Sequence, residues 1–413
     1  MSLSIGIVGL PNVGKSTLFN ALTNNDILAA NYPFATIEPN TGIVHVPDER
    51  LENLAKLYDT TKIIPATVTF VDIAGLVAGA SKGEGLGNKF LANIRGCDAV
   101  IHIVRSFNDN NVIHISEKIN PRDDIDIINT ELILADIQTI ETRLVKMRKD
   151  AKAQPKLKIV ADYLNELIDK LKTGTPLSQI ANLKIDMIYD LHLLTAKPVI
   201  YVFNVDEETL TNNDKKNELK KLVEPARTSQ DPDTMSPTPG LPTVPRNDFS
   251  GVNVSTDMFP SDKIISKSLS PNPVAGRIAS GTCVFVCAKL EDELKILTPT
   301  DSAELLESYG VKETGLLQLI HVAYDILGLQ SYLTAGPKEV RAWTIKKGAS
   351  APEAAGVIHG DFERGFIAAE IVNYDDLISA GSKSTARSSG KMRTEGKTYV
   401  MQPNDVVEFR FNV

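Results

Sequence analysis

Short apolar runs alternate with longer amphipathic segments through most of the first 300 residues. Most of the runs lead into Gly, Asp or Asn, which is typical of buried strands in a parallel sheet. The runs are SIGIVGL, ATVTFVDIAG, DAVIHIVRSF, KPVIYVFNVD and GTCVFVCAKL. Helical spacing of Leu18, Phe19 and Leu22 follows the first run. The pattern predicts βαβ units, and therefore an α/β fold with a mostly parallel sheet covered on both faces.

Two stretches with helical spacing interrupt this alternation between about residues 121 and 185. Their apolar positions are Ile128, Leu132, Ile140 and Leu144, and then Ile159, Tyr163, Leu167 and Leu171. Pro155 separates the stretches, and Gly174 with Pro176 ends the second. We expect an antiparallel helical hairpin that projects from the sheet domain; two ordinary helices packed on that domain are the alternative.

The segment from about 226 to 282 is rich in Pro, Ser, Thr and Asp and shows no sustained period. Such a segment buries too little apolar surface to offset its ordering entropy, so we expect a disordered insertion. A genuine insertion and a gene-model artefact such as retained intron sequence both remain open.

The pattern changes again after about residue 304. A helix is expected in TGLLQLIHVAYDILGL, and VRAWTIKKG, GVIHGDF, GFIAAEIVNYDDLIS and DVVEFRFNV alternate as short strands with one helix. We therefore expect a first domain over residues 1–303 and a small α+β module over residues 304–413.

Composition excludes several classes of protein. The 413 residues carry a formal net charge of −8, so the chain as a whole is not a nucleic-acid binder and RNA contact would need a local patch. No run approaches the roughly 20 apolar residues of a membrane span, and the N-terminal run is too short for a signal peptide. Cys97, Cys283 and Cys287 form a sparse, odd set, which favours a cytoplasmic protein with buried thiols over disulfides or a zinc site. We expect a monomer.

The sequence GLPNVGKST matches the phosphate-loop pattern G-x-x-x-x-G-K-[ST] between a predicted strand and a predicted helix. Glycines let backbone N–H groups converge on phosphate oxygens, and the helix N-terminus adds its positive end. The predicted nucleotide-binding residues are Asn12, Val13, Gly14, Lys15, Ser16 and Thr17. Lys15 is also the candidate catalytic residue, because its positive charge would lie beside the β- and γ-phosphates. The Ser16 hydroxyl is the candidate ligand for Mg²⁺.

Further candidates follow the first helix and the second run. Asp72 ends that run, where a carboxylate would hold Mg²⁺ through a water molecule, and the Gly75 N–H is placed to touch the γ-phosphate. Thr36 is the candidate that closes on Mg²⁺ and the γ-phosphate, and a structural Thr in a surface loop is the alternative.

Together with these motifs, the stretches YPFATIEPN, DIAGLVAGASKGEGLGNKFL and NVDE resemble the Obg-related P-loop GTPases. The resemblance is strongest to the YchF subfamily, known in eukaryotes as Obg-like ATPases. It covers residues 1 to about 225 and about 283 to 413, and it implies a C-terminal TGS-like β-grasp domain. It also implies a Mg²⁺-dependent ATPase associated with the ribosome or translation.

The base-reading motif departs from that of guanine-specific enzymes, which place Asn-Lys-x-Asp where this chain has Asn204, Val205, Asp206 and Glu207. Val205 removes the Lys that packs along guanine, and Glu207 lengthens the carboxylate arm. The residues favour ATP and leave GTP open, and the family resemblance implies ATP. A second group of base contacts is expected from Cys287, Ala288 and Lys289.

Two further positions bear on catalysis. Leu76 stands where many GTPases carry a Gln that orients the attacking water, so we expect slow intrinsic hydrolysis. Asn12 matches the position that holds a K⁺ ion in potassium-responsive relatives, and a preference for its turn geometry is the alternative. A protein that senses nucleotide without hydrolysing it therefore remains a second hypothesis, while a nucleotide kinase is disfavoured because no acceptor site or Arg-rich lid is apparent.

A partner surface is indicated by the stretch GSKSTARSSGKMRTEGK. It contains Lys383, Arg387, Lys391, Arg393 and Lys397, with Glu395 as its one acidic residue. We expect a local positive field that binds the ribosome or ribosomal RNA, and a solvated loop and helix face is the alternative.

Deleting residues 228–280 should leave nucleotide affinity and melting temperature nearly unchanged, because loop length adds closure entropy only logarithmically. Calorimetry and ATP titration on the full chain and on the deletion variant would measure both. A large fall in melting temperature would show that the segment packs against the fold.

Overall fold

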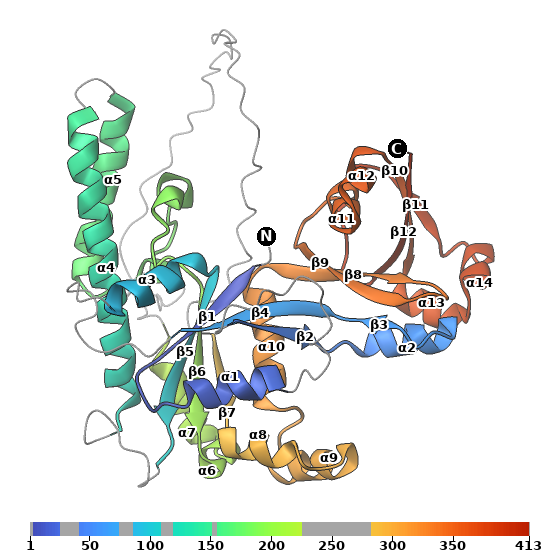
Figure 1. Cartoon of the computed structure of the whole chain (residues 1–413), viewed down its shortest axis with the longest axis horizontal. Coiled ribbons are helices and arrows are strands. Elements are labelled where there is room, and N and C mark those ends of the chain that lie inside the picture. Colours follow the sequence, from blue (N-terminus) through green and yellow to red (C-terminus); the bar gives the residue numbers. More distant parts are fainter. Residues whose placement is uncertain are drawn as a thin grey trace, which may run out of the picture. The chain divides into compact units, whose positions relative to one another are not determined.

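The structure is a computed structural model that describes residues 3–24, 41–73, 86–108, 119–150, 155–224 and 282–412. The predicted insertion at 226–282 lies outside these residues apart from Thr282. Figure 1 shows a first sheet of strand order β2-β4-β1-β5-β6-β7 and a second sheet of order β11-β10-β12-β8-β9-β3. In the described part of the chain, no helix is long and apolar enough to cross a membrane.

The first sheet confirms the α/β prediction. Its central strands run parallel, and β2 pairs antiparallel with β4 at one edge. The strands are β1 Ser4–Val8, β2 Thr41–Val46, β4 Ala66–Asp72, β5 Ala99–Ser106, β6 Val199–Val205 and β7 Cys283–Val286. Each of the apolar runs in the first 300 residues became one of the parallel strands, because burial on both faces demands continuous apolar sequence.

The helices of this part of the chain are α1 Lys15–Asn24, α3 Leu86–Gly96, α4 Pro121–Asp150, α5 Pro155–Lys172, α6 Glu207–Thr211, α7 Asn213–Lys221, α8 Ala288–Leu294, α9 Pro299–Ser308 and α10 Gly315–Ile326. Helices α1, α4 and α10 pack against strands of the first sheet. Local sequence sets several of their starts: the Thr314 side chain accepts from Leu317 N at α10, and Asn212 accepts from Asp214 N and Lys215 N at α7. Apolar residues of α4 and α10 then join those of the strands in one core.

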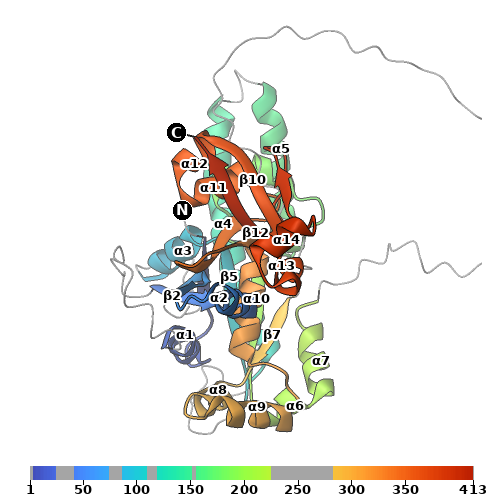
Figure 2. The ribbon, with the colours of Figure 1, turned by 90° about the vertical axis from the view of Figure 1, so that its right-hand side faces the viewer.

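The predicted helical hairpin is confirmed, and α4 and α5 lie side by side in Figures 1 and 2. The N-terminal half of α4 packs on the sheet through Ile128 and Leu132, whereas Ile140 and Leu144 belong to a separate hairpin core. Short 3-10 turns over residues 177–191 complete that core. Ile159 departs from the expected pattern, because its side chain is 63% exposed on α5.

The C-terminal module is an α+β fold, as predicted. Its hairpin β8–β9 is antiparallel, β12 pairs parallel with β8, and β10 pairs antiparallel with β12, which is the strand order of a β-grasp domain. The elements are β8 Leu329–Ala335, β9 Val340–Lys346, α11 Ala351–Ile358, α12 Gly360–Arg364, β10 Phe366–Asn373, α13 Tyr374–Ala380, α14 Lys383–Ser388, β11 Arg393–Glu395 and β12 Asp405–Phe411.

The expected strand in GVIHGDF is wrong, because that stretch belongs to α11 and α12. The helix begins at a capping box in which Glu353 accepts from the Ser350 N–H, with Pro352 in its first turn. This helix-start signal precedes the stretch and outweighs its apolar residues. Strands β2 and β8 and the helix α2 Glu49–Tyr58 were not predicted.

The expected boundary at residue 304 falls inside α9. The next helix, α10, packs against the first sheet, where a Cβ on Gly315 would lie 2.6 Å from Phe285 O of β7. Both views show α10 beside β7 (Figures 1 and 2). The change of pattern in the sequence therefore precedes the start of the second sheet at β8.

The N-terminal half of the chain also contributes to the second sheet. The strand β3 Ile63–Ile64 pairs parallel with β9. The Arg50 guanidinium of α2 donates to Pro403 O at 2.7 Å and to Asn404 Oδ1 at 2.8 Å. Segments that are far apart in the sequence therefore hold the C-terminal sheet together.

A buried carboxylate fixes the base of the helical hairpin. Asp136 of α4 is fully buried and accepts three hydrogen bonds, from Leu194 N at 2.8 Å, Thr195 N at 2.8 Å and Thr195 Oγ1 at 2.7 Å. Burial raises the pKa of Asp136, and these hydrogen bonds oppose that shift. The carboxylate ties the segment before β6 to α4.

Replacing Asp136 by Ala should lower the free energy of unfolding by about 3 kcal/mol, because three buried donors lose their acceptor. Urea denaturation followed by circular dichroism would measure the change. Asp169→Ala, at an exposed position on α5, is the matched control and should change stability by less than about 0.5 kcal/mol. Equal losses in the two variants would contradict the role of Asp136.

Candidate functional site

The carboxyl ends of the parallel strands meet at one edge of the first sheet. At this edge β1 lies between β4 and β5, so the chain leaves β1 toward one side and later returns on the other. Ligands of open α/β sheets bind in the crevice that such a reversal of strand order creates. The predicted phosphate loop, between β1 and α1, lies at this point.

The loop backbone requires glycine at its end. Gly14 has a φ of +98°, and a Cβ there would lie 2.5 Å from Asn204 Nδ2. Asn12 also has a left-handed backbone, with a φ of +63°, which Asn tolerates better than most residues. Val13, also in the loop, is fully buried. The strand, loop and helix thus have the arrangement that a phosphate loop requires.

Lys15 at the start of α1 and Asp72 at the end of β4 interact electrostatically. The Lys15 ammonium donates to Leu10 O at 2.7 Å, and the residue is only 9% exposed. Burial lowers the pKa of Lys15 while Asp72 raises it, and burial raises the pKa of Asp72 while Lys15 lowers it. For both groups burial is the larger cause of the pKa shift, because it disfavours the charged form. An anion near Lys15 and a cation near Asp72 would therefore each stabilise the charged form of its neighbour.

The donor set beside Lys15 fits a divalent cation. Asp72 Oδ1 is buried and makes no hydrogen bond with the residues that the structure describes, and Ser16 is exposed in the first turn of α1. A carboxylate oxygen and a hydroxyl are hard oxygen ligands, which Mg²⁺ prefers. Thr17, the last predicted residue of the loop, is also exposed.

Asn204 joins the two sides of the crevice. Its Nδ2 donates to Val13 O of the phosphate loop at 3.1 Å, and its Oδ1 accepts from Ala288 N at 3.4 Å. The residue is 7% exposed at the end of β6. Its amide therefore positions the loop as well as standing where a base would be read.

The remaining predicted base contacts differ in what they can offer. Val205 and Cys287 are buried in an apolar cluster, so their backbone rather than their side chains can face a nucleotide. The Glu207 carboxylate accepts from Lys289 Nζ at 2.8 Å, which bridges the start of α6 and the start of α8. Asp206 caps α6 by accepting from Thr209 N and is thereby engaged in local structure.

Two polar residues beside the site were not singled out from the sequence. His102 and Arg105 interrupt the apolar run of β5, and they are 2% and 1% exposed. Burial and the charge of Lys15 lower the pKa of His102 to about 3, so the imidazole is neutral at physiological pH. The Arg105 guanidinium lies 4.6 Å from the centre of the Phe107 ring. The sequence signal that could have identified these two residues is a polar residue inside an otherwise apolar run.

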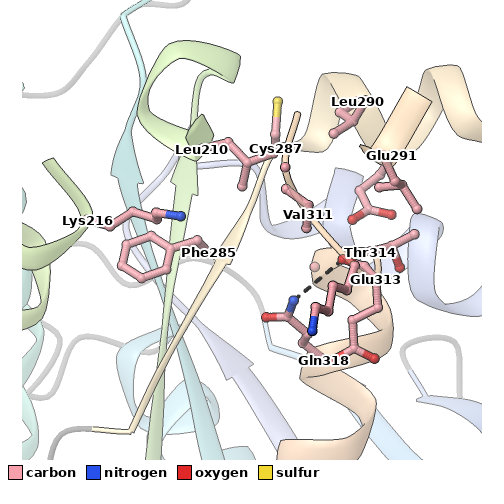
Figure 3. Close-up of a pocket in the computed structure, with 14 residues that line it drawn as sticks. Leu210, Lys216, Phe285, Cys287, Leu290, Glu291, Val311, Glu313, Thr314 and Gln318 are labelled. Atoms are coloured by element: carbon pink, nitrogen blue, oxygen red, sulfur yellow. Dashed lines mark hydrogen bonds between the residues drawn. The ribbon is translucent and has the colours of Figure 1, made fainter. Parts of the chain in front are cut away.

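A separate cavity of about 550 Å³ lies beside β7, the start of α8 and the start of α10 (Figure 3). Cys287 is the one predicted site residue in its lining, which also includes Phe285, Glu291 and Thr314. Glu291 accepts from Leu316 N at 3.2 Å, and burial raises its pKa to about 7. Its carboxylate thus caps the N-terminus of α10. The phosphate loop, and not this cavity, is therefore the candidate nucleotide site.

Thr36, Gly75 and Leu76 lie outside the described residues, so their predicted roles stay predictions.

The expected local positive field at residues 383–397, in which Glu395 was the one opposing charge, is weaker than the sequence indicates. The structure places Lys383 against Glu408, Arg387 against Glu370 at 2.8 Å, Lys391 against Asp376 at 3.0 Å and Arg393 against Asp405 at 3.6 Å. These carboxylates come from β10, α13 and β12, so a count of charges along the segment could not include them. The segment is largely neutralised by the fold around it.

Comparison with known proteins extends the likeness over the whole chain. A family model described as a 50S ribosome-binding GTPase matches residues 4–134. The C-terminal domain model of YchF GTPases, described as a protein of unknown function, matches residues 329–412.

Two curated relatives named ribosome-binding ATPase YchF cover the full length of both chains. The Bacillus subtilis protein is 44% identical to this chain, and that of Escherichia coli O157:H7 is 42% identical. The solved structure of the Schizosaccharomyces pombe YchF GTPase is 33% identical and has a TM-score of 0.76. The match covers 99% of this chain and 98% of the S. pombe chain.

Asn204→Ala should weaken nucleotide affinity about 10- to 100-fold, because Val13 O and Ala288 N lose their shared partner and the loop loses its position. Titration with a fluorescent ATP analogue would measure this. Asn165→Ala, on the exposed face of α5, serves as the control and should bind normally. Unchanged affinity in Asn204→Ala would show that the loop holds its shape without this side chain.

Proposed function

The chain belongs to the YchF family of P-loop NTPases, and we propose that it is a Mg²⁺-dependent ATPase that acts as a nucleotide-controlled switch on the ribosome. The relatives carry the name ribosome-binding ATPase, which supports the ribosome as partner and ATP as substrate. The observation that carries the proposal is the phosphate loop itself, with buried Lys15 near an Asp72 oxygen that has no hydrogen-bond partner among the described residues.

The loop residues divide the work of binding the triphosphate. The backbone N–H groups of residues 12–17 and the start of α1 surround the phosphates, and the Lys15 ammonium pairs with the β- and γ-phosphate oxygens. Ser16 would hold Mg²⁺ directly and Asp72 through a water molecule. When bound, Mg²⁺ neutralises charge that develops on the transferred phosphoryl group. Thr36 and Gly75 are proposed to contact the γ-phosphate and so to report hydrolysis to the rest of the chain.

The base-side residues support ATP over GTP. Guanine recognition needs a carboxylate that accepts from N1–H and N2–H₂, and here the Glu207 carboxylate is paired with Lys289. The buried Val205 supplies no long stem to pack along a guanine ring. Adenine can be read by backbone groups at residues 205 and 287–289 and by the remaining Asn204 amide hydrogen, which asks less of these side chains.

Hydrolysis is proposed to be slow in the isolated protein. Leu76 cannot orient a water molecule, so another group must supply that function. Asn12 is a candidate ligand for K⁺, although its left-handed backbone explains the choice of Asn equally well. Single-turnover hydrolysis with and without K⁺ decides between these roles. A protein that binds ATP but hydrolyses none under either condition would be a nucleotide sensor.

Lys15→Ala and Ser16→Ala should each abolish productive binding of Mg²⁺ and ATP while leaving the melting temperature close to that of the parent protein. The first variant removes the charge that faces the phosphates, and the second removes a metal ligand. ATP and GTP titrations in Mg²⁺, followed by single-turnover assays, would measure the effect. Lys172→Ala, an exposed position at the far end of α5, is the control. Parental ATP affinity in both site variants would refute the assignment.

A further inference from the structure

The cavity of about 550 Å³ beside β7 and α8 is partly apolar (Figure 3). Its volume falls within the range of about 300–1,000 Å³ that is usual for small-molecule sites. Leu210 of α6 and Leu290 of α8 are buried in its wall. The other large apolar residues of the lining are Phe285, Leu306 and Val311. The cavity can therefore hold the apolar part of a small molecule.

Positive charge also lines this cavity. Lys216 and Lys312 belong to the lining, and neither forms an ion pair with the residues that the structure describes. Figure 3 shows the Lys216 side chain extending from α7 to the Phe285 ring. Lys220 lies one turn further along α7, and its ammonium is 5.9 Å from the centre of the same ring. A negative group in the cavity would meet cations whose charge the fold has not neutralised.

The two carboxylates of the lining are already engaged. Glu291 accepts a hydrogen bond from Leu316 N at 3.2 Å at the start of α10. Burial raises the pKa of Glu291 to about 7, so its negative charge is only partly developed near neutral pH. The Glu313 carboxylate lies 4.0 Å from His321 Nδ1. The positive end of α10 adds to the charge of the two lysines, and the balance in the cavity favours an anion.

The cavity shares part of its wall with the candidate nucleotide site. Cys287 lines the cavity, and the N–H of the next residue, Ala288, donates to Asn204 Oδ1 at 3.4 Å. Leu290 and Glu291 then line the cavity again. The first turn of α8 therefore contributes to both places, and a molecule packed against it would restrain the residues that are proposed to face the base.

We propose that this cavity is a second ligand site, which takes a small organic anion with an apolar body and strengthens ATP binding when it is occupied. The carboxylate or phosphate of the ligand lies near Lys216 and Lys312, and the apolar body packs on Phe285 and Leu290. Restraining the first turn of α8 in advance lowers the cost of ordering it around the nucleotide. The coupling rests on the proposed function, because it assumes that residues 287–289 contact the base, whereas the site itself does not.

The first test is isothermal titration calorimetry of the full chain, without nucleotide, with phenylacetate as the probe. We expect a Kd of about 0.1–1 mM, as the size of the probe allows. The uncharged 2-phenylethanol should bind at least about 10-fold more weakly, because it offers the lysines no negative charge. Equal affinity for the alcohol would overturn recognition of an anion, and no binding of phenylacetate at about 10 mM would overturn the site.

Phenyl phosphate distinguishes the two kinds of anion. It is titrated into the Lys15→Ala variant, so that the phosphate loop does not compete for it. Phenylacetate is titrated into the same variant, and the tighter probe identifies the carboxylate or the phosphate as the preferred group.

Variants of the lining test where the probe binds. Lys216→Gln with Lys312→Gln should weaken phenylacetate binding at least about 10-fold, and Val311→Trp should do the same by filling the cavity. Lys221→Gln with Lys338→Gln makes the same change of charge at exposed positions outside the cavity and should bind as the parent does. Parental affinity in either cavity variant, at an unchanged melting temperature, would overturn the location.

The coupling is measured with a non-hydrolysable ATP analogue. Saturating phenylacetate should raise the affinity for the analogue about 3- to 10-fold, and the analogue should raise the affinity for phenylacetate by the same factor, because coupling is reciprocal. An unchanged affinity in the parent, or an equal rise in the variant with Gln at residues 216 and 312, would overturn the coupling. If the parent binds no analogue at all, the proposed function fails, while titration of phenylacetate alone still decides the cavity.

Discussion

The amide of Asn204 is the contact on which the site depends. It joins Val13 O in the phosphate loop to Ala288 N after β7, across the end of β6. Gly14 must lack a side chain because this amide occupies the space that a Cβ would fill. The loop proposed to hold phosphates and the loop proposed to hold the base are therefore positioned by one residue, and parallel pairing of the strands brings both to the same edge.

The C-terminal module is tied to the nucleotide domain by the chain that follows the first helix. The segment containing Thr36 leads into β2, then α2, and then β3, which pairs with β9 of the second sheet. Arg50 of α2 binds the backbone and side chain of residues just before β12. The element proposed to sense the γ-phosphate is thus followed by β2 of the first sheet, and then by α2, which packs on β8 and β9, and by β3, which belongs to the second sheet. The α+β module is a continuation of the nucleotide domain rather than an appended unit.

Charge is distributed by the fold in a way that a linear count misses. The cations of residues 383–397 meet carboxylates that β10, α13 and β12 bring to them, and their field is largely cancelled. Long-range packing therefore decides how much of the positive charge of a basic segment remains unneutralised.

The sequence by itself determined the parallel strands, the phosphate loop, the hairpin and the likeness to the YchF family. Continuous apolar runs mark strands buried on both faces, and a loop that binds phosphate needs Gly, Lys and Ser at one spacing. Only the tertiary structure decided that Asn204 holds the loop, that Lys289 engages Glu207, and that β3 joins the second sheet. Each of these contacts joins residues that the chain separates widely. The spacing of hydrophobic residues predicts only which face of a helix or strand is buried. It does not predict which distant residues that face, or a polar side chain beside it, will contact.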